Sequence, residues 1–344
     1  MHPIIQKPVI ATVGLDVGYR ATKAVSDGGS ICFPSVAGHS HEIKFKAAEI
    51  SGKYPGDQLT DTHGDWFIGD LAIKQVPASE LLQLQGRTGN GDEFGMQFRV
   101  RMMYAALAKL FPQNTRDEEA IHIRIATGLP VDHMQDAPAL KAALGGIHRI
   151  KSNNADFTAY ISDVAVMPQP YGTIYSQQFN PDGTLNEFHT ANKVAVLDIG
   201  GYTIDAAVDD NGEYIDSESG SSESGVYTAQ QRIAAVLEAD FREKPTHKMI
   251  ETVLRTGKLK AFGEEHDYSK ESAEALKPLR DASLTLTSRL WKTGMGLDVI
   301  YVAGGGGPFG ESVVKAAYRQ AKLVTNSQMS NAIGYRSYAL HVAE

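Results

Sequence analysis

Short apolar runs separated by glycine-containing turns characterise the first part of the chain. Three such runs follow residue 10, in the order ATVGLDVG, ATKAVSDGG and SICFPSVAG. Runs of this length, broken by Gly and Asp-Gly signals, predict a β-meander. The polar, glycine-rich segment from about His39 to Gly64 predicts a small inserted element with loops, after which DWFIGDLAIKQ returns to ordered structure.

Strand and helix patterns alternate after this meander. The sequence between Gly95 and Phe111, MQFRVRMMYAALAKLF, has helical periodicity, and EAIHIRIATGLPVD then predicts a strand that runs into a turn. A loop rich in Asn, Pro and Gly extends from about Gln177 to Asn192. The β-to-α alternation predicts an α/β protein.

The second half of the chain repeats the opening pattern. In KVAVLDIGGYTIDAAVDDNGEYI an apolar strand leads to Asp, a Gly turn and a second strand follow, and a third strand comes after an Asn-Gly turn. GLDVGYRATKAV and VLDIGGYTIDAAV share one frame of apolar, Asp, apolar and Gly positions. This self-similarity predicts a duplicated fold with one phosphate-facing hairpin in each lobe.

Helical patterns dominate the remainder of the chain. Helices are predicted over YTAQQRIAAVLEADF, HKMIETVLRTG and KESAEALKPLRDASLTLTSRLWKT, and SNAIGYRSYALHV predicts a last helix. DVIYVAGGGG is an apolar strand that ends in four glycines. ESVVKAAYRQA then predicts a helix with Glu311 in its first turn, where a carboxylate suits the helix dipole.

Length and composition narrow the class of protein. At 344 residues the chain exceeds the usual size of a single core, which predicts two lobes. Hydrophobic content of 42% and charged content of 22% are those of an ordinary globular protein, and a net charge of −8 argues against non-specific nucleic-acid binding. The single cysteine, Cys32, cannot form an internal disulfide, and its apolar run ICFPSV predicts a buried core residue rather than a catalytic thiol.

Targeting and membrane signals are not evident. The N-terminal sequence MHPIIQKPVIATVG has neither the basic start nor the long apolar stretch of a secretion signal. No apolar run reaches the roughly 20 residues that span a bilayer, and the two N-terminal prolines argue against an amphipathic membrane-binding helix. We therefore expect a cytoplasmic protein without membrane contact.

The first Gly turn carries residues suited to phosphate binding. Asp16 ends a strand, and Gly18 begins a tight turn whose backbone N–H groups supply positive potential without a bulky side chain. Lys23 on the returning strand adds a point charge for a phosphate. Taken alone, this pattern is equally that of an ordinary hairpin with a surface lysine.

The second Gly turn repeats the arrangement with Asp198, Gly200, Gly201 and Thr203. Two facing hairpins would form a phosphate clamp, and two carboxylates beside a triphosphate suit Mg²⁺, which keeps several of its waters. Asp205 lies one strand residue too far along for direct metal contact. It is interpreted as a structural carboxylate satisfied by neighbouring backbone.

A third glycine-rich element, Gly304 to Gly307, lies between a strand and a helix, where a nucleotide can approach the backbone closely. It is not a P-loop, because no Gly-Lys-Ser or Gly-Lys-Thr follows. GGGGPFGES also lacks the spacing of the dinucleotide-binding fingerprint. By itself this element is a weak signal, and a flexible loop is the alternative interpretation.

In chain order these elements resemble the superfamily of actin, the sugar kinases and the heat-shock chaperones. GLDVGYRATK resembles its first phosphate loop, LDIGGYTID its second and YVAGGGG its adenosine loop, and TGLPV and NAIGY resemble the two segments of its interdomain hinge. The resemblance extends over the chain after residue 10. It is greatest to the bacterial plasmid-segregation actins of the ParM type, through FPSVAG, FIGDLA and VMPQP in addition.

This resemblance implies an α/β protein with the actin-like fold. Two duplicated RNase H-like lobes would each hold a mixed β-sheet flanked by helices, with a nucleotide cleft between them. Lobe I would comprise residues 10–185, with a small inserted subdomain at about 39–75. Lobe II would comprise residues 186–344, with a smaller subdomain at about 230–275 and a last helix that packs back on lobe I.

The resemblance also implies the site residues. Asp16 and Asp198 would take part in catalysis and organise Mg²⁺ through its waters. Gln169, in VMPQPYG, would orient the attacking water, because a glutamine positions but cannot act as a strong base. A capping or loop role between two prolines is the alternative for Gln169. ATP or ADP would contact three loops through Gly18, Tyr19, Arg20, Lys23, Gly200, Gly201, Tyr202, Thr203, Gly304, Gly305 and Gly306.

Two positions depart from actin, since Tyr19 and Arg20 replace small residues of the first loop. Side-chain contact from a serine to phosphate is lost there, whereas backbone donation survives, and Arg20 either adds charge or faces solvent. The Ser-rich segment 217–226, SESGSSESGV, resembles the turn and helix start near the nucleotide in this family. A solvated linker is the alternative for that segment.

Three classes of function compete, because this fold hosts unrelated activities. The resemblance favours an ATPase that polymerises with itself into a dynamic head-to-tail filament, for segregation of plasmid or other DNA through a DNA-binding adaptor protein. DNA contact would then be indirect, and the choice between ATP and GTP stays open. The alternatives are a small-molecule kinase, which needs a carboxylate facing a substrate pocket, and a chaperone-like ATPase, which needs a following peptide-binding domain. Neither of those signatures is evident.

Overall fold

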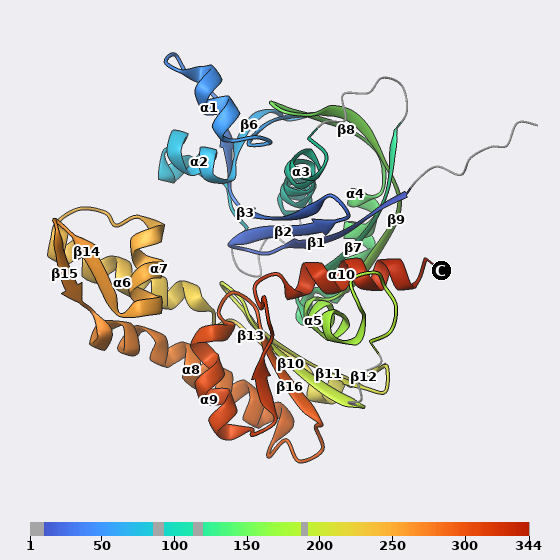
Figure 1. Ribbon diagram of the computed structural model, residues 1–344, viewed down its shortest axis with the longest axis vertical. Helices are drawn as coiled ribbons and strands as arrows, with labels where there is room; N and C mark the ends of the chain where they lie inside the picture. Colours follow the sequence, from blue (N-terminus) through green and yellow to red (C-terminus); the bar gives the residue numbers. More distant parts are fainter. Residues whose placement is uncertain (1–9, 85–92, 113–119, 187–191, 344) are drawn as a thin grey trace, which may run out of the picture. The chain divides into compact units, whose positions relative to one another are not determined.

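Two compact units make up the chain. The computed structural model describes residues 10–84, 93–112, 120–186 and 192–343 (Figure 1). Contacts divide the chain into one unit formed by Met1–His189 with Asn331–Glu344 and a second formed by Thr190–Ser330. Each unit is built on a mixed β-sheet with helices packed against it.

The first unit contains a nine-stranded sheet with the order β3-β2-β1-β7-β9-β8-β5-β6-β4. Strands β1, β2 and β3 form an antiparallel meander, and β7 and β9 extend the sheet in parallel with β1. The remaining strands pair antiparallel beyond β9. The strands are β1 (Ile10–Val17), β2 (Ala21–Ser26), β3 (Gly29–Pro34), β4 (Ala37–His39), β5 (Gln58–Asp61), β6 (Gly64–Ile68), β7 (Ile121–Leu129), β8 (Gly146–Ser152) and β9 (Asp156–Pro168).

Helices lie on both faces of this sheet (Figure 1). Helix α3 lies within the curve of the sheet, against the meander and β8 and next to α4, whereas α5 and α10 pack on the other face at β7 and β1. Most residues of α3 are buried, as expected for a helix enclosed by sheet. The helices are α1 (Ala47–Lys53), α2 (Gly69–Gln75), α3 (Glu93–Leu110), α4 (Ala137–Leu144), α5 (Gln169–Gln178) and α10 (Ser330–His341), with 3-10 turns at Ala78–Glu80 and Val131–Asp136.

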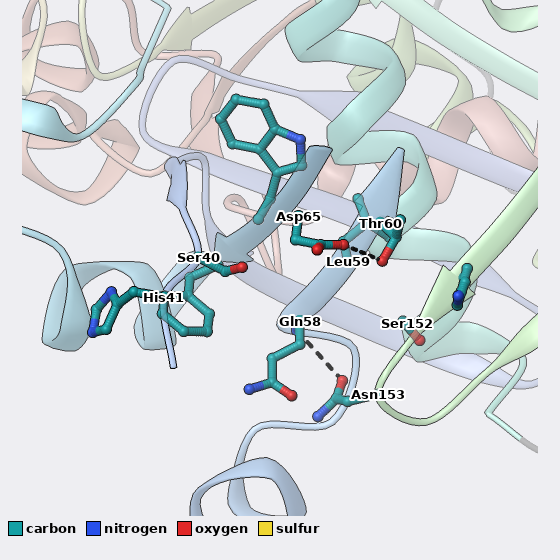
Figure 2. A pocket seen from close by; sticks show the side chains of 11 residues that line it. Ser40, His41, Gln58, Leu59, Thr60, Asp65, Ser152 and Asn153 are labelled. Carbon is teal, nitrogen blue, oxygen red and sulfur yellow. Dashed lines mark hydrogen bonds between the residues drawn. The ribbon is translucent and has the colours of Figure 1, made fainter. Parts of the chain in front are cut away.

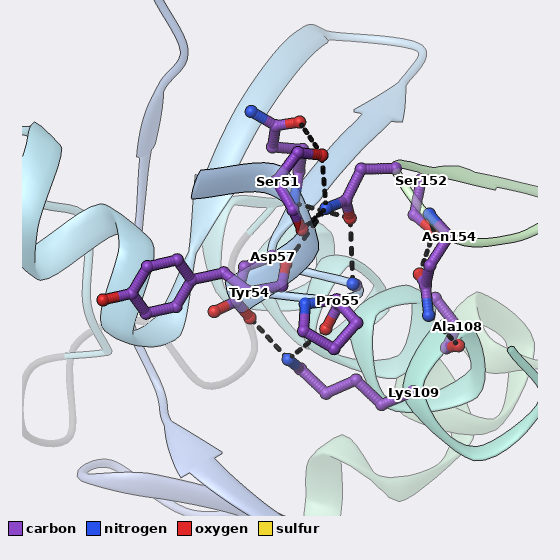
Figure 3. Close-up of polar contacts among 11 residues, drawn as sticks. Ser51, Tyr54, Pro55, Asp57, Ala108, Lys109, Ser152 and Asn154 are labelled. Atoms are coloured by element: carbon purple, nitrogen blue, oxygen red, sulfur yellow. Dashed lines mark hydrogen bonds and ion pairs between the residues drawn. The ribbon is translucent and has the colours of Figure 1, made fainter. Parts of the chain in front are cut away.

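The polar segment from His39 to Gly64 contains α1 and most of the β5–β6 hairpin, and polar contacts fasten it to the rest of its unit (Figure 3). Lys109 of α3 donates to the main-chain oxygen of Pro55 at 2.9 Å and pairs with the carboxylate of Asp57 at 2.5 Å. Burial raises the pKa of Asp57, and the Lys109 ammonium opposes that rise. The inserted element is therefore tied to the central helix by a partly buried ion pair.

The second unit contains a sheet with the order β12-β11-β10-β16-β17, and β13 also pairs with β11. An apolar core lies between this sheet and α6, α8 and α9, and it extends to α7 and the β14–β15 hairpin. The strands are β10 (Lys193–Ile199), β11 (Ile204–Asp210), β12 (Glu213–Tyr214), β13 (Gly220–Ser222), β14 (Lys258–Ala261), β15 (Glu264–Asp267), β16 (Val299–Ala303) and β17 (Ala321–Leu323). The helices are α6 (Val226–Phe241), α7 (His247–Thr256), α8 (Ser269–Trp291) and α9 (Gly307–Ala317), with a 3-10 turn at Asp216–Glu218.

Helix α7 shows how the local sequence sets an element's ends. The Thr246 hydroxyl accepts a hydrogen bond from the Met249 amide at 3.3 Å, which satisfies a donor of the first turn. Gly257 follows the last turn at φ +69°, a left-handed conformation that glycine adopts without steric cost. The helix therefore begins at a threonine cap and ends at a glycine.

The α/β class and the predicted elements are confirmed. The meander, α3, the repeated strand-turn-strand at β10 and β11, the helices α6, α7 and α8, and the last helix α10 occur where the sequence patterns place them. The boundaries given for the lobes and subdomains, and the nucleotide cleft, stay predictions. Residues 1–9 and 187–191, which bear on the N-terminal and loop expectations, lie outside the described residues. Within the described part of the chain, no helix combines the length and apolar character needed to cross a membrane.

Two predictions from the sequence are wrong. Cys32 is exposed, because it lies on the edge strand β3, where side chains alternate and Phe33 is the residue that turns inward, at 6% exposed. Glu311 is not in the first turn of its helix, because α9 already begins at Gly307. The patterns also named no element in the segment that forms α4, β8 and most of β9.

Candidate functional site

The first Gly turn joins β1 to β2 in the first unit. Asp16 lies directly opposite Lys23 across the strand pair, and the Gly18 amide donates to the Ala21 carbonyl at 3.2 Å, which closes the turn. A Cβ atom at Gly18 would lie 3.2 Å from the Lys23 ammonium nitrogen and 3.0 Å from the Ala21 oxygen. Glycine at position 18 therefore leaves room for the lysine to lie against the turn.

Asp16 is the buried centre of a polar cluster. Its side chain accepts a hydrogen bond from Lys23 Nζ at 2.9 Å on one oxygen and from Gln169 Nε2 at 3.0 Å on the other, and the residue is 2% exposed. The structure thus brings together three of the predicted site residues, one of them 153 positions away along the chain. Both side-chain oxygens of this buried carboxylate therefore have a hydrogen-bond donor.

Gln169 is the first residue of α5 and directly follows β9. Its main-chain oxygen accepts a hydrogen bond from the hydroxyl of Tyr335 at 3.0 Å. The backbone of Gln169 is therefore held by α10 while its side chain reaches Asp16. Gln169 does begin a helix, but its side chain contacts the predicted centre.

Arg99 contacts the end of β1 next to the first turn, and it was not predicted from the sequence. The side chain of this α3 residue is buried, and its Nη1 atom donates to the main-chain oxygen of Val17 at 3.2 Å. Burial lowers the pKa of Arg99, and the nearby Tyr19 and Asp16 oppose that fall. The sequence does carry one signal for Arg99, which is an arginine at an apolar position of the predicted helix. A charged side chain that is buried at such a position needs a specific partner.

The second Gly turn joins β10 to β11 in the second unit and repeats the first in register. Asp198 lies opposite Asp205, and the Gly200 amide donates to the Thr203 carbonyl at 2.8 Å, as Gly18 does to Ala21. Asp198 is 5% exposed. The second turn therefore places a carboxylate where the first turn has the Lys23 ammonium.

Asp205 accepts hydrogen bonds from two hydroxyl groups, which fits its interpretation as a structural carboxylate. Thr203 Oγ1 donates to one of its oxygens at 2.8 Å, and Ser221 Oγ donates to the other. Ser221 belongs to β13, which pairs with β11, so the Ser-rich segment 217–226 is part of the fold and the linker interpretation is wrong. The hydroxyl of Thr203, a predicted phosphate contact, is engaged with Asp205.

The start of α6 is bound to the second turn. The Val226 amide donates to the Gly200 carbonyl at 3.2 Å, and the Tyr227 amide donates to the Gly201 carbonyl at 2.8 Å. The ring of Tyr227 also stacks on Tyr202, with the ring centroids 4.5 Å apart. The end of the Ser-rich segment therefore fixes the turn.

The glycine run after β16 lies against the same turn of the second unit. Strand β16 runs parallel to β10 with Ala303 beside Asp198, so Gly304 follows directly at the Asp198 side chain. Gly304 has φ +80°, and a Cβ atom there would lie 2.2 Å from Asp198 Oδ1. The Gly306 amide donates to the Ile199 carbonyl at 2.8 Å. Glycine is therefore required at Gly304 both by conformation and by space.

Each unit presents a buried aspartate beside a glycine turn at the carboxyl end of parallel strands, the edge at which open α/β sheets bind ligands. Whether Asp16 suits Mg²⁺ depends on which hydrogen bonds its oxygens already accept. Both Asp16 oxygens already accept hydrogen bonds, so Asp16 suits contact through metal-bound water better than direct ligation. Among the residues that the structure describes, no group of three or more His, Cys, Asp or Glu side chains could enclose a metal.

Comparisons with known families follow the same division of the chain. The N-terminal domain of the actin-like proteins matches residues 14–172, and the C-terminal domain of the archaeal actin homologue, MreB-like, matches residues 196–315. The chain belongs to the actin-like proteins. No curated protein sequence matches it.

Solved structures share the fold of this actin-like protein at low sequence identity. A non-polymerisable quadruple mutant of pCBH ParM is 21% identical with a TM-score of 0.73, and a 15-stranded ParM filament from Clostridium botulinum is 20% identical with a TM-score of 0.72. An archaeal actin homologue in complex with ADP is 18% identical with a TM-score of 0.71. Each comparison covers 96% of this chain and 99% of the other. They establish the actin-like fold.

The other predicted residues of this actin-like protein also lie at the Gly turns or in the glycine run. Tyr19 is 8% exposed, and Arg20 is partly exposed while its main-chain oxygen accepts from the Ser35 amide at 3.0 Å. Gly305 has open space where a Cβ atom would stand, with only Gln328 at 3.9 Å. The contacts predicted for these residues with nucleotide stay proposals.

A separate pocket of about 330 Å³ lies in the first unit at β5 and β6 (Figure 2). Several of its polar side chains bond to each other or to backbone: Thr60 donates to Asp65 at 2.6 Å, and Asn153 accepts from the Gln58 amide at 3.4 Å. None of the predicted site residues belongs to its lining, which consists of Ser40, His41, Gln58, Leu59, Thr60, Asp65, Trp66, Phe67, Lys151, Ser152 and Asn153.

Proposed function

We propose that this actin-like protein binds Mg²⁺·ATP, hydrolyses the ATP to ADP and phosphate, and uses the nucleotide to control head-to-tail assembly of its own copies into a filament. The repeated hairpin carries this proposal. Both turns close with the same N–H···O bond and both bury an aspartate at the same register position. Burying a carboxylate is costly, so an ordinary surface hairpin gives no reason for both to do it.

The first unit supplies the groups for phosphate and water in this proposal. Lys23, held at the turn by Asp16, offers its ammonium as a point charge for a phosphate. Because the amide nitrogen of Gln169 donates to Asp16, its side-chain oxygen is the atom that accepts a hydrogen bond from the attacking water. Gln169 then acts by orientation, which supplies most of the catalysis in phosphoryl transfer.

The second unit supplies Asp198, the Gly200–Gly201 turn and the glycine run Gly304–Gly306. Asp198 would hold waters of the metal ion, and the absence of a side chain at Gly304 keeps space at its carboxylate. Since the Thr203 hydroxyl bonds to Asp205, phosphate contact at this turn falls to backbone amides. Bound Mg²⁺ would neutralise charge that develops on the phosphates.

Assembly and cargo rest on the relatives. One structural neighbour is a ParM filament, another is a ParM mutant made non-polymerisable, and a third is an actin homologue with ADP. By resemblance to ParM-type plasmid-segregation actins, we extend the proposal to movement of a plasmid or other DNA. A DNA-binding adaptor protein would link the filament to that cargo.

Right-angle light scattering after addition of Mg²⁺·ATP to the purified protein tests the proposal, with phosphate release measured in the same sample. ADP and an EDTA-treated ATP sample serve as controls, GTP tests the choice of base, and pelleted material is inspected by electron microscopy. We expect scattering to rise with ATP, filaments to be visible, and the signal to decay as phosphate appears.

Other outcomes separate the parts of the proposal. Nucleotide binding with phosphate release but no polymer would refute filament assembly and leave an ATPase. Binding without polymer or hydrolysis would favour a small-molecule kinase, to be tested with candidate acceptors. No nucleotide binding at all would refute the site.

A further inference from the structure

Tyr335 of α10 is the residue outside the predicted site that contacts it most specifically. It is 0% exposed and is the largest of the wholly buried side chains among the described residues. Its hydroxyl donates to the main-chain oxygen of Gln169 at 3.0 Å, while Gln169 Nε2 donates to Asp16 at 3.0 Å. Gln169 is therefore held from two sides, through its backbone by Tyr335 and through its side chain by Asp16.

The space for this hydroxyl is created by Gly128 on β7. A Cβ atom at Gly128 would lie 2.0 Å from the Tyr335 hydroxyl oxygen and 3.0 Å from the Cα atom of Gln169. Any side chain at this position would displace the tyrosine, the glutamine or both. The contact is thus built into three elements, since β7, α5 and α10 all meet at the backbone of Gln169.

Two more glycines bring α10 close enough for the contact. A Cβ atom at Gly334 would lie 1.7 Å from the Gly172 carbonyl oxygen, and one at Gly172 would lie 2.6 Å from the Asn331 Cα atom. Next to this crossing the Thr173 hydroxyl donates to Asn331 Oδ1 at 2.9 Å. The first turn of α5 therefore has little freedom to shift relative to α10.

The tyrosine bond is not needed to satisfy the backbone. In an α-helix the carbonyl of the first residue already accepts from the amide four positions on, so the Tyr335 hydroxyl is an additional donor to the Gln169 oxygen. Its effect is to fix where α5 begins. A shift of that first residue would move the Gln169 amide away from Asp16.

We propose that Tyr335 is a positioning residue for Gln169, which sets the geometry in which the glutamine orients the attacking water. This inference rests on the proposed ATPase function and deepens it. A tyrosine in a merely structural role would contribute to folding stability and would leave hydrolysis by the folded protein unchanged.

Tyr335→Phe tests the inference, because it removes the hydroxyl and keeps the ring. We expect kcat for phosphate release to fall by about tenfold or more, while the KM for ATP stays within about twofold, since misplacement of a catalytic group affects the chemical step. Tyr318→Phe is the matched control. Tyr318 is also buried, at 3% exposed, and donates its hydroxyl to a main-chain oxygen, that of Lys292 at 3.1 Å in the second unit. This control should keep the wild-type kcat.

A double-mutant cycle shows whether Tyr335 acts through Gln169. In a Gln169→Ala background the Tyr335→Phe change should have almost no further effect on kcat, because the side chain that it positions is absent. Full additivity of the two losses would overturn the inference, as would an unchanged kcat in Tyr335→Phe alone.

A readout without turnover separates this inference from the proposed function. The side-chain amide resonances of Gln169, assigned by comparison with Gln169→Ala in a ¹⁵N correlation spectrum of the full chain, should move in Tyr335→Phe and stay in place in Tyr318→Phe. Unmoved resonances in Tyr335→Phe would refute positioning. A wild type that binds ATP but releases no phosphate would refute the proposed hydrolysis, while the amide spectrum still decides whether Tyr335 positions Gln169.

Discussion

At the scale of single residues, the two similar turns differ most in the residue that faces the buried aspartate on the neighbouring strand. The aspartate is Asp16 in the first turn and Asp198 in the second. In the first turn Asp16 faces Lys23, and the ion pair leaves little net charge. In the second turn Asp198 faces Asp205, so two buried carboxylates lie side by side. A divalent cation would offset the repulsion between two like charges that lie next to each other. The second turn should therefore contribute more of the affinity for a divalent cation.

Replacement of Asp198 by alanine tests this residue directly. We expect Asp198→Ala to lower the rate of phosphate release by about 10- to 100-fold, since groups that hold the waters of a metal ion have effects of this size. Asp209→Ala is the matched control. Asp209 is a buried carboxylate on the same strand pair, at 3% exposed, and it accepts from the Gly212 amide at 2.9 Å.

Both variants lose a buried carboxylate, so both should have lower melting temperatures. Phosphate release is therefore measured well below the lower of the two midpoints. Release by Asp198→Ala at the wild-type rate would refute the assignment of Asp198, and an equal loss in Asp209→Ala would show that the effect is one of stability.

The site residues differ in how far the sequence could predict them. Asp16, Gly18 and Lys23 follow from one local hairpin pattern, and the structure has them together at one turn. Gln169 was found by resemblance, because no local pattern predicts a contact across 153 positions. Tyr335 and Arg99 were missed, since each acts on backbone oxygens of a distant element.

At the scale of elements, the crossing of α5 and α10 depends on glycine. Gly334→Ala should lower the free energy of unfolding by at least about 2 kcal/mol, because its Cβ atom would meet the Gly172 carbonyl oxygen at 1.7 Å and the neighbouring backbone cannot yield cheaply. Gly52→Ala in α1 is the control. Nothing lies within 4 Å of a Cβ atom there, so we expect no loss and a gain of up to about 1 kcal/mol.

Urea unfolding followed by circular dichroism measures both changes. If Gly334→Ala unfolds at the wild-type urea concentration, the helices can separate without cost and the close crossing does not matter for stability. A large loss in Gly52→Ala would instead show that α1 needs glycine for a reason unrelated to space.

The contact between α6 and the start of α8 predicts a pH dependence. The Tyr268 hydroxyl donates to Asp240 at 3.0 Å, and burial, followed by the effect of that carboxylate, raises the pKa of Tyr268 to about 12. An unfolded tyrosine titrates near pH 10, so the folded state holds its proton more tightly. The resulting stabilisation is complete below about pH 10 and is lost as the pH rises from about 10 to 12.

Tyr268→Phe isolates this contribution. At pH 8 the variant should be less stable than the wild type by about 1 kcal/mol, the usual value of one hydrogen bond. The difference between the two free energies of unfolding should shrink or reverse at pH 11 to 12. A constant difference between pH 8 and pH 12 would contradict the prediction.

The elements themselves were predictable where periodicity is strong and local. Helices α6, α7 and α8 and the strands next to both Gly turns follow from spacing alone. The order of strands does not, because the nine-stranded sheet joins β5, β6 and β4 to β8 through pairings far apart in sequence. Cys32 was misplaced for the same reason, since whether β3 is an edge strand depends on that order.

At the scale of the whole molecule, duplication is the feature that the sequence makes most plain. Two copies of one hairpin frame predict two similar units, and the chain has two compact units with one such hairpin in each. The purpose of the duplication is not written in either hairpin. Under the proposed function, the duplication would serve control of the affinity between copies of the chain by nucleotide state, which local patterns do not encode.

The coupling between hydrolysis and assembly gives a prediction for the filament as a whole. If Gln169 orients the attacking water, Gln169→Ala should bind ATP with nearly wild-type affinity, assemble with Mg²⁺·ATP and release phosphate at least about tenfold more slowly than the wild type. Because ADP-bound subunits would form later, its filaments should persist in proportion after free ATP is removed. Light scattering after addition of an ATP-consuming enzyme, with phosphate release in parallel, measures both rates.

Gln97→Ala is the control for this experiment, since Gln97 lies on α3 and its side chain makes an exposed contact with Glu93 at 2.9 Å. It should release phosphate and disassemble as the wild type does. Slow phosphate release by Gln169→Ala together with wild-type disassembly would show that polymer lifetime is set by subunit dissociation and not by hydrolysis. If Gln169→Ala binds ATP more weakly but hydrolyses each bound ATP at the normal rate, Gln169 contributes to nucleotide binding and not to the chemical step.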